Sequence, residues 1–355
     1  MNKRILKTAF LLSFAGALST SQVRADFYPV PEMMDKGFAK SQSVSIKNYS
    51  RFVVTAKEKE KLLVDFCERL SIYFAKFKWD KDPCGKVDWQ TSLKTYNGHP
   101  LIYAVFGKGS QTTLLLGGVH PDENTPVPVG FKFAEHLFNN PDAYQKKDVK
   151  VIIAPLVNPD GFLRNVPART NSNGIDVNRN FFTLDWYDSA VDWWEMSKKK
   201  DIRHFPGYFP NSEIETLFQI KLIDDLVPDK IVSMHAPLGF LDYDGPGDRK
   251  PGNLSDAEKK AKMLAQAISE KSQNYRIVDY SFYPGSLGNY AGNERGIPTV
   301  TLELKTTDAS KFGEYWNQFL PGLMESVEYP FKKSATLNRS NASNFYESYR
   351  RIENL

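Results

Sequence analysis

Three residues in this 355-residue sequence have the types and positions needed to bind one metal ion. His120 and Glu123 stand three residues apart in GGVHPDE, directly after the apolar run TTLLL, and His235 follows a second apolar run in SMHA. Neither motif alone is strong evidence for a metal site. His-x-x-Glu also occurs in surface turns, and a lone histidine at a strand end commonly bonds to the backbone. Two imidazoles and one carboxylate form a catalytic zinc set with an open fourth position. Together the three residues predict a site for one Zn²⁺ ion.

Glu303 is the candidate general base. It lies in TLEL, inside an otherwise apolar run, where a carboxylate is costly to bury unless it has a partner. A position beside the metal would explain it, because Glu303 could then take a proton from a zinc-activated water and pass it to a leaving amine. The alternative is a glutamate on an edge strand that faces solvent.

Three arginines are candidate carboxylate-binding groups. Arg164, Arg169 and Arg179 lie in the stretch from NPDG to NRNF, after another apolar run. A guanidinium can bind a carboxylate through two parallel hydrogen bonds. The alternative is a set of solvated loop residues.

The pattern of apolar residues predicts the elements that would position these groups. From Leu101 onward, short apolar runs alternate with amphipathic segments, which indicates an α/β fold with a mixed, largely parallel sheet covered by helices on both faces. In such sheets ligands bind beyond the carboxyl ends of the strands, so the residues that follow TTLLL and KIVSM can meet there. Ser212 and Glu215 have the spacing of a capping box and predict the start of a helix that ends before Pro228. A further helix is expected over residues 57–75.

Taken together, the motifs resemble the zinc carboxypeptidases related to pancreatic carboxypeptidase A. The matching segments span roughly residues 100–310 and read HPDE, NPDG, ARTNSNGIDVNRNF, SEIET, SMHA, PGS and TLEL. The resemblance implies a zinc metallocarboxypeptidase in which His120, Glu123 and His235 bind the metal. Glu303 then matches the general base and acid of the family.

The same resemblance assigns the groups that contact substrate. Arg169 matches the arginine that polarises the scissile carbonyl and stabilises the oxyanion. Asn178 and Arg179 match the pair that binds the terminal carboxylate of the substrate. Tyr283 is the candidate for the mobile tyrosine of the family, with Tyr280 as the alternative.

Within this family the pattern resembles the bacterial murein peptide amidases. The shared features are the compact loop between NPDG and NRNF, the HAPL segment and PGSLG. Those enzymes cleave the γ-D-glutamyl–diaminopimelate bond of cell-wall peptides, so a peptidoglycan stem peptide is the expected substrate. Leu287 matches a position at the base of the side-chain pocket, where an acidic residue would select lysine or arginine, so a leucine argues against that specificity.

Residues 1–25 have the features of a signal peptide. A basic start (MNKRILK) precedes the apolar run TAFLLSFAGAL, and the segment ends in VRA. Cleavage near Ala25 would make the protein periplasmic or secreted, whereas the amidases that it resembles act in the cytoplasm on recycled tripeptide. Export would therefore favour peptidoglycan itself, or its periplasmic fragments, as the substrate.

The charge of the chain gives no sign of a nucleic-acid partner. The formal net charge is +4, and the four basic residues of the signal segment account for all of it, so the mature chain is neutral. No other segment is long and apolar enough to cross a membrane, so no stable membrane insertion is expected after signal removal.

The remaining sequence divides into three parts. Residues 26–95 predict an N-terminal helical segment packed on the catalytic domain, residues 96–331 the zinc peptidase domain, and residues 332–355 a polar tail. Cys67 and Cys84 favour a disulfide, which an oxidising compartment permits. Metal ligation and two unrelated buried thiols are the alternatives.

The sequence therefore predicts an exported zinc metallopeptidase, a hydrolase that cleaves a peptide or amide bond next to a C-terminal, carboxylate-bearing residue. The expected substrate makes it a γ-D-glutamyl–diaminopimelate amidase or carboxypeptidase. The alternative is a general secreted metallocarboxypeptidase that acts on proteins and peptides. A non-catalytic wall-binding pseudoenzyme is less favoured, because the metal ligands, Glu303 and Arg169 are all present. No G-x-S-x-G motif supports a serine hydrolase.

Overall fold

The computed structural model describes residues 49–244 and 256–331. The predicted signal peptide (1–25) and polar tail (332–355) lie outside the described residues, as does the first part of the predicted N-terminal segment. Within the described ranges, no helix combines the length and the apolar character needed to span a membrane.

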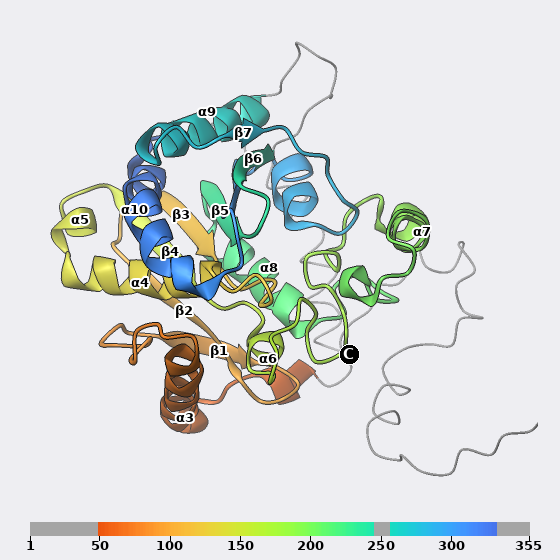
Figure 1. Cartoon of the computed structure of the whole chain (residues 1–355), viewed down its shortest axis with the longest axis horizontal. Coiled ribbons are helices and arrows are strands. Elements are labelled where there is room, and N and C mark those ends of the chain that lie inside the picture. Colours follow the sequence, from red (N-terminus) through yellow and green to blue (C-terminus); the bar gives the residue numbers. More distant parts are fainter. Residues whose placement is uncertain (1–48, 245–255, 332–355) are drawn as a thin grey trace, which may run out of the picture.

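In the described part of the chain, an eight-stranded mixed sheet forms the centre of the fold (Figure 1). Its order is β1-β2-β4-β3-β5-β8-β6-β7. The four central strands β4, β3, β5 and β8 are parallel, and β7 is parallel to β6, whereas the pairs β1–β2, β2–β4 and β6–β8 are antiparallel. The strands are β1 (Gln90–Lys94), β2 (Pro100–Phe106), β3 (Gln111–Leu116), β4 (Val149–Ala154), β5 (Lys230–His235), β6 (Phe240–Asp244), β7 (Ile277–Val278) and β8 (Thr299–Glu303).

Helices cover both faces of this sheet. One face carries α3 (Ala56–Lys76), α4 (Pro126–Asn139), α9 (Asp256–Lys271) and α10 (Phe312–Glu328), and the other carries α8 (Ile214–Leu226) and the π-helical turn η4 (Gly288–Asn293). Shorter helices lie in the connections: η2 (Tyr49–Phe52), α5 (Asp142–Gln145), α6 (Pro159–Phe162), α7 (Trp186–Ser197), η3 (Ile202–His204) and η5 (Ala309–Lys311). In Figure 1, α7 lies to one side of the sheet, beside the loops that carry the candidate arginines.

Side chains of the central strands alternate between two apolar cores. Leu115 and Val232 pack in the core beneath α4, α9 and α10, whereas Leu114 and Ile231 pack in the core beneath α8. Because both faces are buried, these strands read in the sequence as continuous apolar runs. The prediction of a mixed, largely parallel α/β sheet with helices on both faces is confirmed.

The start of α8 differs from the predicted capping box. The helix begins at Ile214 after Glu213, and no side chain caps it. Instead, Asn171 Nδ2 donates to Glu213 Oε2 at 2.6 Å and to Glu215 Oε2 at 2.9 Å. The predicted cap from Ser212 is therefore wrong, because the acidic side chains at the start of α8 bind the loop that carries the candidate arginines.

The N-terminal helix α3 packs on the rest of the fold through aromatic rings. Phe74 is buried, and its ring centroid lies 5.4 Å from that of Phe131 on α4 and 6.4 Å from that of Phe162 on α6. A disulfide joins Cys67 of α3 to Cys84, across a separation of 17 residues. This segment is thus part of the same apolar core as the sheet.

Replacing Phe74 with alanine is expected to lower the free energy of unfolding by about 3–5 kcal/mol, because the substitution leaves a cavity between α3, α4 and α6. Urea denaturation followed by circular dichroism measures this change. Ile72→Ala is the matched control, since Ile72 lies on the same helix with 69% of its surface exposed, and it should stay within about 0.5 kcal/mol of wild type. Equal effects of the two substitutions would show that α3 does not stabilise the fold through its buried face.

Candidate active site

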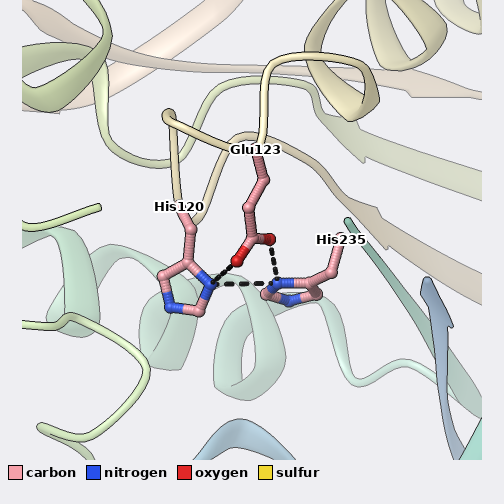
Figure 2. Close-up of side chains that lie close together, drawn as sticks. All are labelled: His120, Glu123 and His235. Atoms are coloured by element: carbon pink, nitrogen blue, oxygen red, sulfur yellow. Dashed lines mark hydrogen bonds and ion pairs between the residues drawn. The ribbon is translucent and has the colours of Figure 1, made fainter. Parts of the chain in front are cut away.

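The carboxyl ends of β3, β5 and β8 meet at one edge of the sheet. β3 is parallel to β5, and His235 at the end of β5 lies opposite Glu303 at the end of β8. His120 and Glu123 lie in the turn that follows β3, and their side chains converge on His235 (Figure 2). The fold thus brings together the three residues that the strand-end positions predicted.

Two glycines allow the chain to turn at the end of β3. Gly118 has φ of 57°, in the left-handed region, and a Cβ atom there would lie 2.7 Å from Leu156 Cδ1. The Gly117 N–H donates to the Ala154 carbonyl at 2.9 Å, so the turn continues the pairing with the neighbouring strand β4. The HPDE segment is therefore held against the sheet, where its side chains can reach the end of β5.

The three buried side chains present a compact set of metal-binding atoms. The two Nδ1 atoms of His120 and His235 are 3.1 Å apart, and each lies 3.0–3.1 Å from an oxygen of Glu123. A tetrahedral zinc ion with bonds of about 2.1 Å holds its ligand atoms roughly 3.4 Å apart. Among the histidine, cysteine and acidic side chains of the described residues, these three lie close enough together to hold a metal ion.

The hydrogen bonds of the two Nε2 atoms indicate which ring nitrogen of each histidine is free to bind a metal ion. His120 Nε2 lies 2.9 Å from Asp176 Oδ1, a carboxylate that accepts, so Nε2 carries the hydrogen and Nδ1 presents its lone pair. His235 Nε2 lies 3.0 Å from the Ser233 hydroxyl, and burial lowers the pKa of His235, which favours the neutral ring. Two lone pairs and a carboxylate then face one point, an arrangement that fits a divalent cation.

Asp176 also positions Arg169. Arg169 Nε donates to Asp176 Oδ2 at 2.8 Å, and its Nη1 donates to Glu123 Oε1 at 2.9 Å. Burial alone would raise the pKa of Asp176, but the charge of Arg169 and the hydrogen bond from His120 outweigh burial and hold this pKa well below its usual range. The ionised carboxylate therefore fixes both a metal-site histidine and the guanidinium beside the metal site.

Glu303 is buried at the end of β8, as a glutamate beside a metal site should be. Its Oε2 accepts a hydrogen bond from the Leu238 N–H at 3.3 Å. Burial, together with the charge of Glu123, raises the pKa of Glu303 to about 8. The alternative of a solvent-facing glutamate on an edge strand is wrong, because β8 lies between β5 and β6.

Asn178 and Arg179 follow Asp176 and lie beside the metal-binding residues. The Asn178 N–H donates to Asp176 Oδ1 at 3.0 Å, and its Oδ1 accepts from the Leu287 N–H at 2.7 Å. The Nδ2 of Asn178 is thereby left as the donor of that side chain. Arg179 is buried, and its Nε has no hydrogen-bond partner among the described residues. Such donors fit a carboxylate supplied by a ligand.

Tyr283 stacks on Arg179, with the guanidinium carbon 4.5 Å from the ring centroid. Tyr280 lies next to it, with the two ring centroids 6.0 Å apart. Leu287 is buried at the start of η4, where its backbone holds Asn178. The structure therefore places Tyr283 and Leu287 against Arg179 and Asn178, whereas Arg164 donates to the Asn171 carbonyl.

Asp176 and Ser233 were not identified from the sequence. For Asp176 a signal existed, because a carboxylate between Ile175 and Val177 in an apolar setting raises the same question of burial as Glu303 does. For Ser233 there was none, since a serine within a strand has many uses and its partner His235 is revealed only by the fold.

Comparisons with known proteins agree with this geometry. Residues 87–326 match the zinc carboxypeptidase family, peptidase family M14. The chain is 31% identical over 221 residues to murein peptide amidase A of Vibrio campbellii, which covers 61% of this chain and 79% of that protein. It is 32% identical over 220 residues to murein peptide amidase A of Escherichia coli K12, with 61% and 81% covered.

A solved structure supports the fold. Bovine thrombin-activatable fibrinolysis inhibitor, in complex with tick carboxypeptidase inhibitor, superposes with a TM-score of 0.56 at 16% identity, over 76% of this chain and 96% of that chain. At this identity the likeness concerns the fold alone. The match to the family over two thirds of the chain, together with the zinc-compatible His-Glu-His site, shows that this protein belongs to the zinc carboxypeptidase family, a family of metal-dependent hydrolases.

Proposed function

We propose that this protein is an exported zinc hydrolase that cleaves peptidoglycan stem peptides at the γ-D-glutamyl–diaminopimelate bond. The proposal rests on one observation: a metal-binding set with a neighbouring glutamate lies beside donors that can bind a carboxylate. The three metal-binding side chains lie beside Glu303, and the donors of Asn178 and Arg179 lie next to them. The similarity to murein peptide amidases supports the choice of substrate, because it extends over about four fifths of those proteins.

In this proposal His120, Glu123 and His235 hold one zinc ion. Bound there, zinc supplies a Lewis acid that polarises the scissile carbonyl and brings the pKa of a water molecule near neutrality. Asp176 and Ser233 orient the two imidazoles through their Nε2 atoms. Such partners of metal ligands raise the basicity of the ligand and fix its tautomer.

Glu303 acts as the general base and general acid. Its carboxylate accepts a proton from the attacking water and returns that proton to the leaving amine. Arg169, held by Asp176, donates to the carbonyl oxygen as negative charge develops on it. Both groups are buried, and burial strengthens such interactions because little water screens them.

Arg179 and Asn178 bind the terminal carboxylate of the substrate. The Nε of Arg179 and the Nδ2 of Asn178 are the donors, and Tyr283 covers the guanidinium. A substrate bound in this way places its last peptide or amide bond at the metal site. The products are then diaminopimelate and the shortened peptide L-Ala-D-Glu.

The exported protein incubated with L-Ala-γ-D-Glu-diaminopimelate is expected to release diaminopimelate, as measured by mass spectrometry. A zinc chelator should abolish release, and Glu303→Gln should lower kcat about 10²- to 10⁴-fold, because the variant cannot accept the proton. An ordinary peptide with a free C-terminus is the parallel substrate. Cleavage of that peptide alone would overturn the murein proposal in favour of a general metallocarboxypeptidase.

Asp176→Asn is expected to weaken zinc binding about 10- to 100-fold, because the amide cannot hold His120 and Arg169 as the carboxylate does. Competition with a chromogenic chelator measures the dissociation constant. Asp192→Asn, on the exposed side of α7, is the control and should bind zinc as wild type does. Unchanged affinity in Asp176→Asn would show that Asp176 is not needed to orient the ligand.

Expression of the full chain in a Gram-negative host should yield a periplasmic protein whose N-terminal sequence begins at Asp26. Replacing Leu12 with arginine interrupts the apolar run and should leave the uncleaved precursor in the cell, because that run must be apolar to be recognised. Edman degradation and fractionation provide the measurements. A wild-type protein that retains Met1 and stays in the cytoplasm would contradict the export proposal.

A further inference from the structure

Two cations, Arg179 and Lys198, flank a pair of aromatic rings between Arg179 and the end of α7. The Arg179 guanidinium carbon lies 4.5 Å from the centroid of Tyr283, and that ring lies 4.9 Å from the ring of Trp193. On the same indole, the Lys198 ammonium lies 5.1 Å from the ring centroid. Arg179 also contacts this indole, at 5.3 Å. Both cations therefore contact the indole of Trp193, next to the candidate carboxylate-binding residues.

Lys198, unlike Lys200 and Arg203 nearby, makes no ion pair with a described acidic side chain. Lys200 pairs with Glu195 at 2.8 Å, and Arg203 pairs with Asp122 at 2.6 Å. Within the described residues Lys198 makes no ion pair, although it is half-buried and its ammonium lies against the Trp193 ring. A half-buried cation on an aromatic ring is well placed to bind an anion supplied from outside.

The backbone around Lys198 is held in a sparsely populated conformation. Lys199 and Lys200, the next two residues, have φ of 50° and 60°, a left-handed region that residues with side chains seldom adopt. The Lys200 N–H donates to the Trp194 carbonyl at 3.1 Å, and Trp194 Nε1 donates to the Asp201 carbonyl at 2.7 Å. These bonds hold the turn that ends α7. Strain maintained in this way commonly marks a functional position.

The pKa of His204 is consistent with an excess of positive charge in this region. Burial, with the charges of Arg169, Arg179 and Lys198, lowers the pKa of His204 to about 4. Two acids lie near this ring, Asp176 at 3.9 Å from Nδ1 and Asp201 at 3.9 Å from Nε2, and Asp176 already binds Arg169 and His120. This region thus has two cations, Arg179 and Lys198, to which no described acidic side chain is bonded. A ligand with two carboxylates would compensate both.

We propose that Lys198, positioned by Trp193, binds a second carboxylate at the far end of the side chain of the C-terminal residue of the substrate. Arg179 binds the main-chain carboxylate of the same residue. The inference rests on the proposed function and deepens it, because diaminopimelate differs from lysine by one carboxylate at the end of its side chain. The enzyme would accordingly select stem peptides that end in diaminopimelate over those that end in lysine.

The test compares L-Ala-γ-D-Glu-diaminopimelate with L-Ala-γ-D-Glu-lysine, using the full exported enzyme loaded with zinc. Wild type is expected to prefer the first peptide by about tenfold in kcat/KM, the ratio that one charge-assisted bond provides. Lys198→Met should bring this ratio close to one, chiefly through a higher KM for the diaminopimelate peptide. Lys198→Arg should keep most of the preference, because it restores the charge. Lys199→Met, next in the chain, is the matched control and should keep the wild-type ratio.

Three results would overturn the proposal: a wild type without preference, a Lys198→Met enzyme that keeps the preference, or an equal loss on both peptides. If wild type cleaves neither peptide, the function proposed above fails, and Lys198 is then tested on N-blocked dipeptides that end in glutamate or glutamine. A preference for glutamate that Lys198→Met removes would retain carboxylate recognition by this residue. Equal cleavage of both dipeptides would exclude it.

Discussion

The site depends on one buried carboxylate, that of Asp176. Its two oxygens bind His120 Nε2 at 2.9 Å and Arg169 Nε at 2.8 Å, and it also accepts the N–H of Asn178. A buried charge is costly unless it is paired, so this carboxylate keeps its partners in fixed positions. One side chain thereby orients the candidate metal ligand His120, the Arg169 guanidinium and the start of the segment that carries Asn178 and Arg179. A loop rather than a strand carries Asp176, so that loop must itself be held.

Two parts of the chain outside the site hold the loops around it. Glu213 and Glu215, at the start of α8, bind Asn171, whose side-chain oxygen accepts the Ile175 N–H just before Asp176. From the other side, Tyr73 and Lys76 of α3 donate to backbone carbonyls at Leu163 and Asn165, in the loop that leads to Arg169. Asp160 in NPDG likewise binds Thr95 and His99 next to the first strands. The N-terminal segment thus positions the arginine loop in addition to completing the core.

The sequence predicted the metal-binding residues because their position follows from a rule about sheets. A polar residue directly after a buried parallel strand lies at the carboxyl edge, where neighbouring strands place their own end residues, and so His120, Glu123, His235 and Glu303 could be grouped. Asp176 and Lys198 obey no such rule. Asp176 lies in a long loop whose path is set by contacts far away in sequence, and Lys198 directly follows α7, which lies beside the sheet. The capping-box prediction for α8 was wrong for a related reason, because tertiary pairing with Asn171 took the side chains that a local rule would assign to the helix end.

The candidate catalytic centre and the proposed substrate-recognition residue lie in different parts of this fold. The candidate metal-binding residues and Glu303 lie at or just after strand ends of a sheet whose fold recurs in bovine thrombin-activatable fibrinolysis inhibitor at only 16% identity. Trp193 lies on α7 and Lys198 directly follows that helix, whose buried residues Trp186 and Ala190 lie in its first half. Because the distal end of α7 is free of core packing, its side chains can change without disturbing the geometry of the metal site. An enzyme built in this way can keep one hydrolytic centre and acquire recognition of a new C-terminal residue by altering a single surface helix.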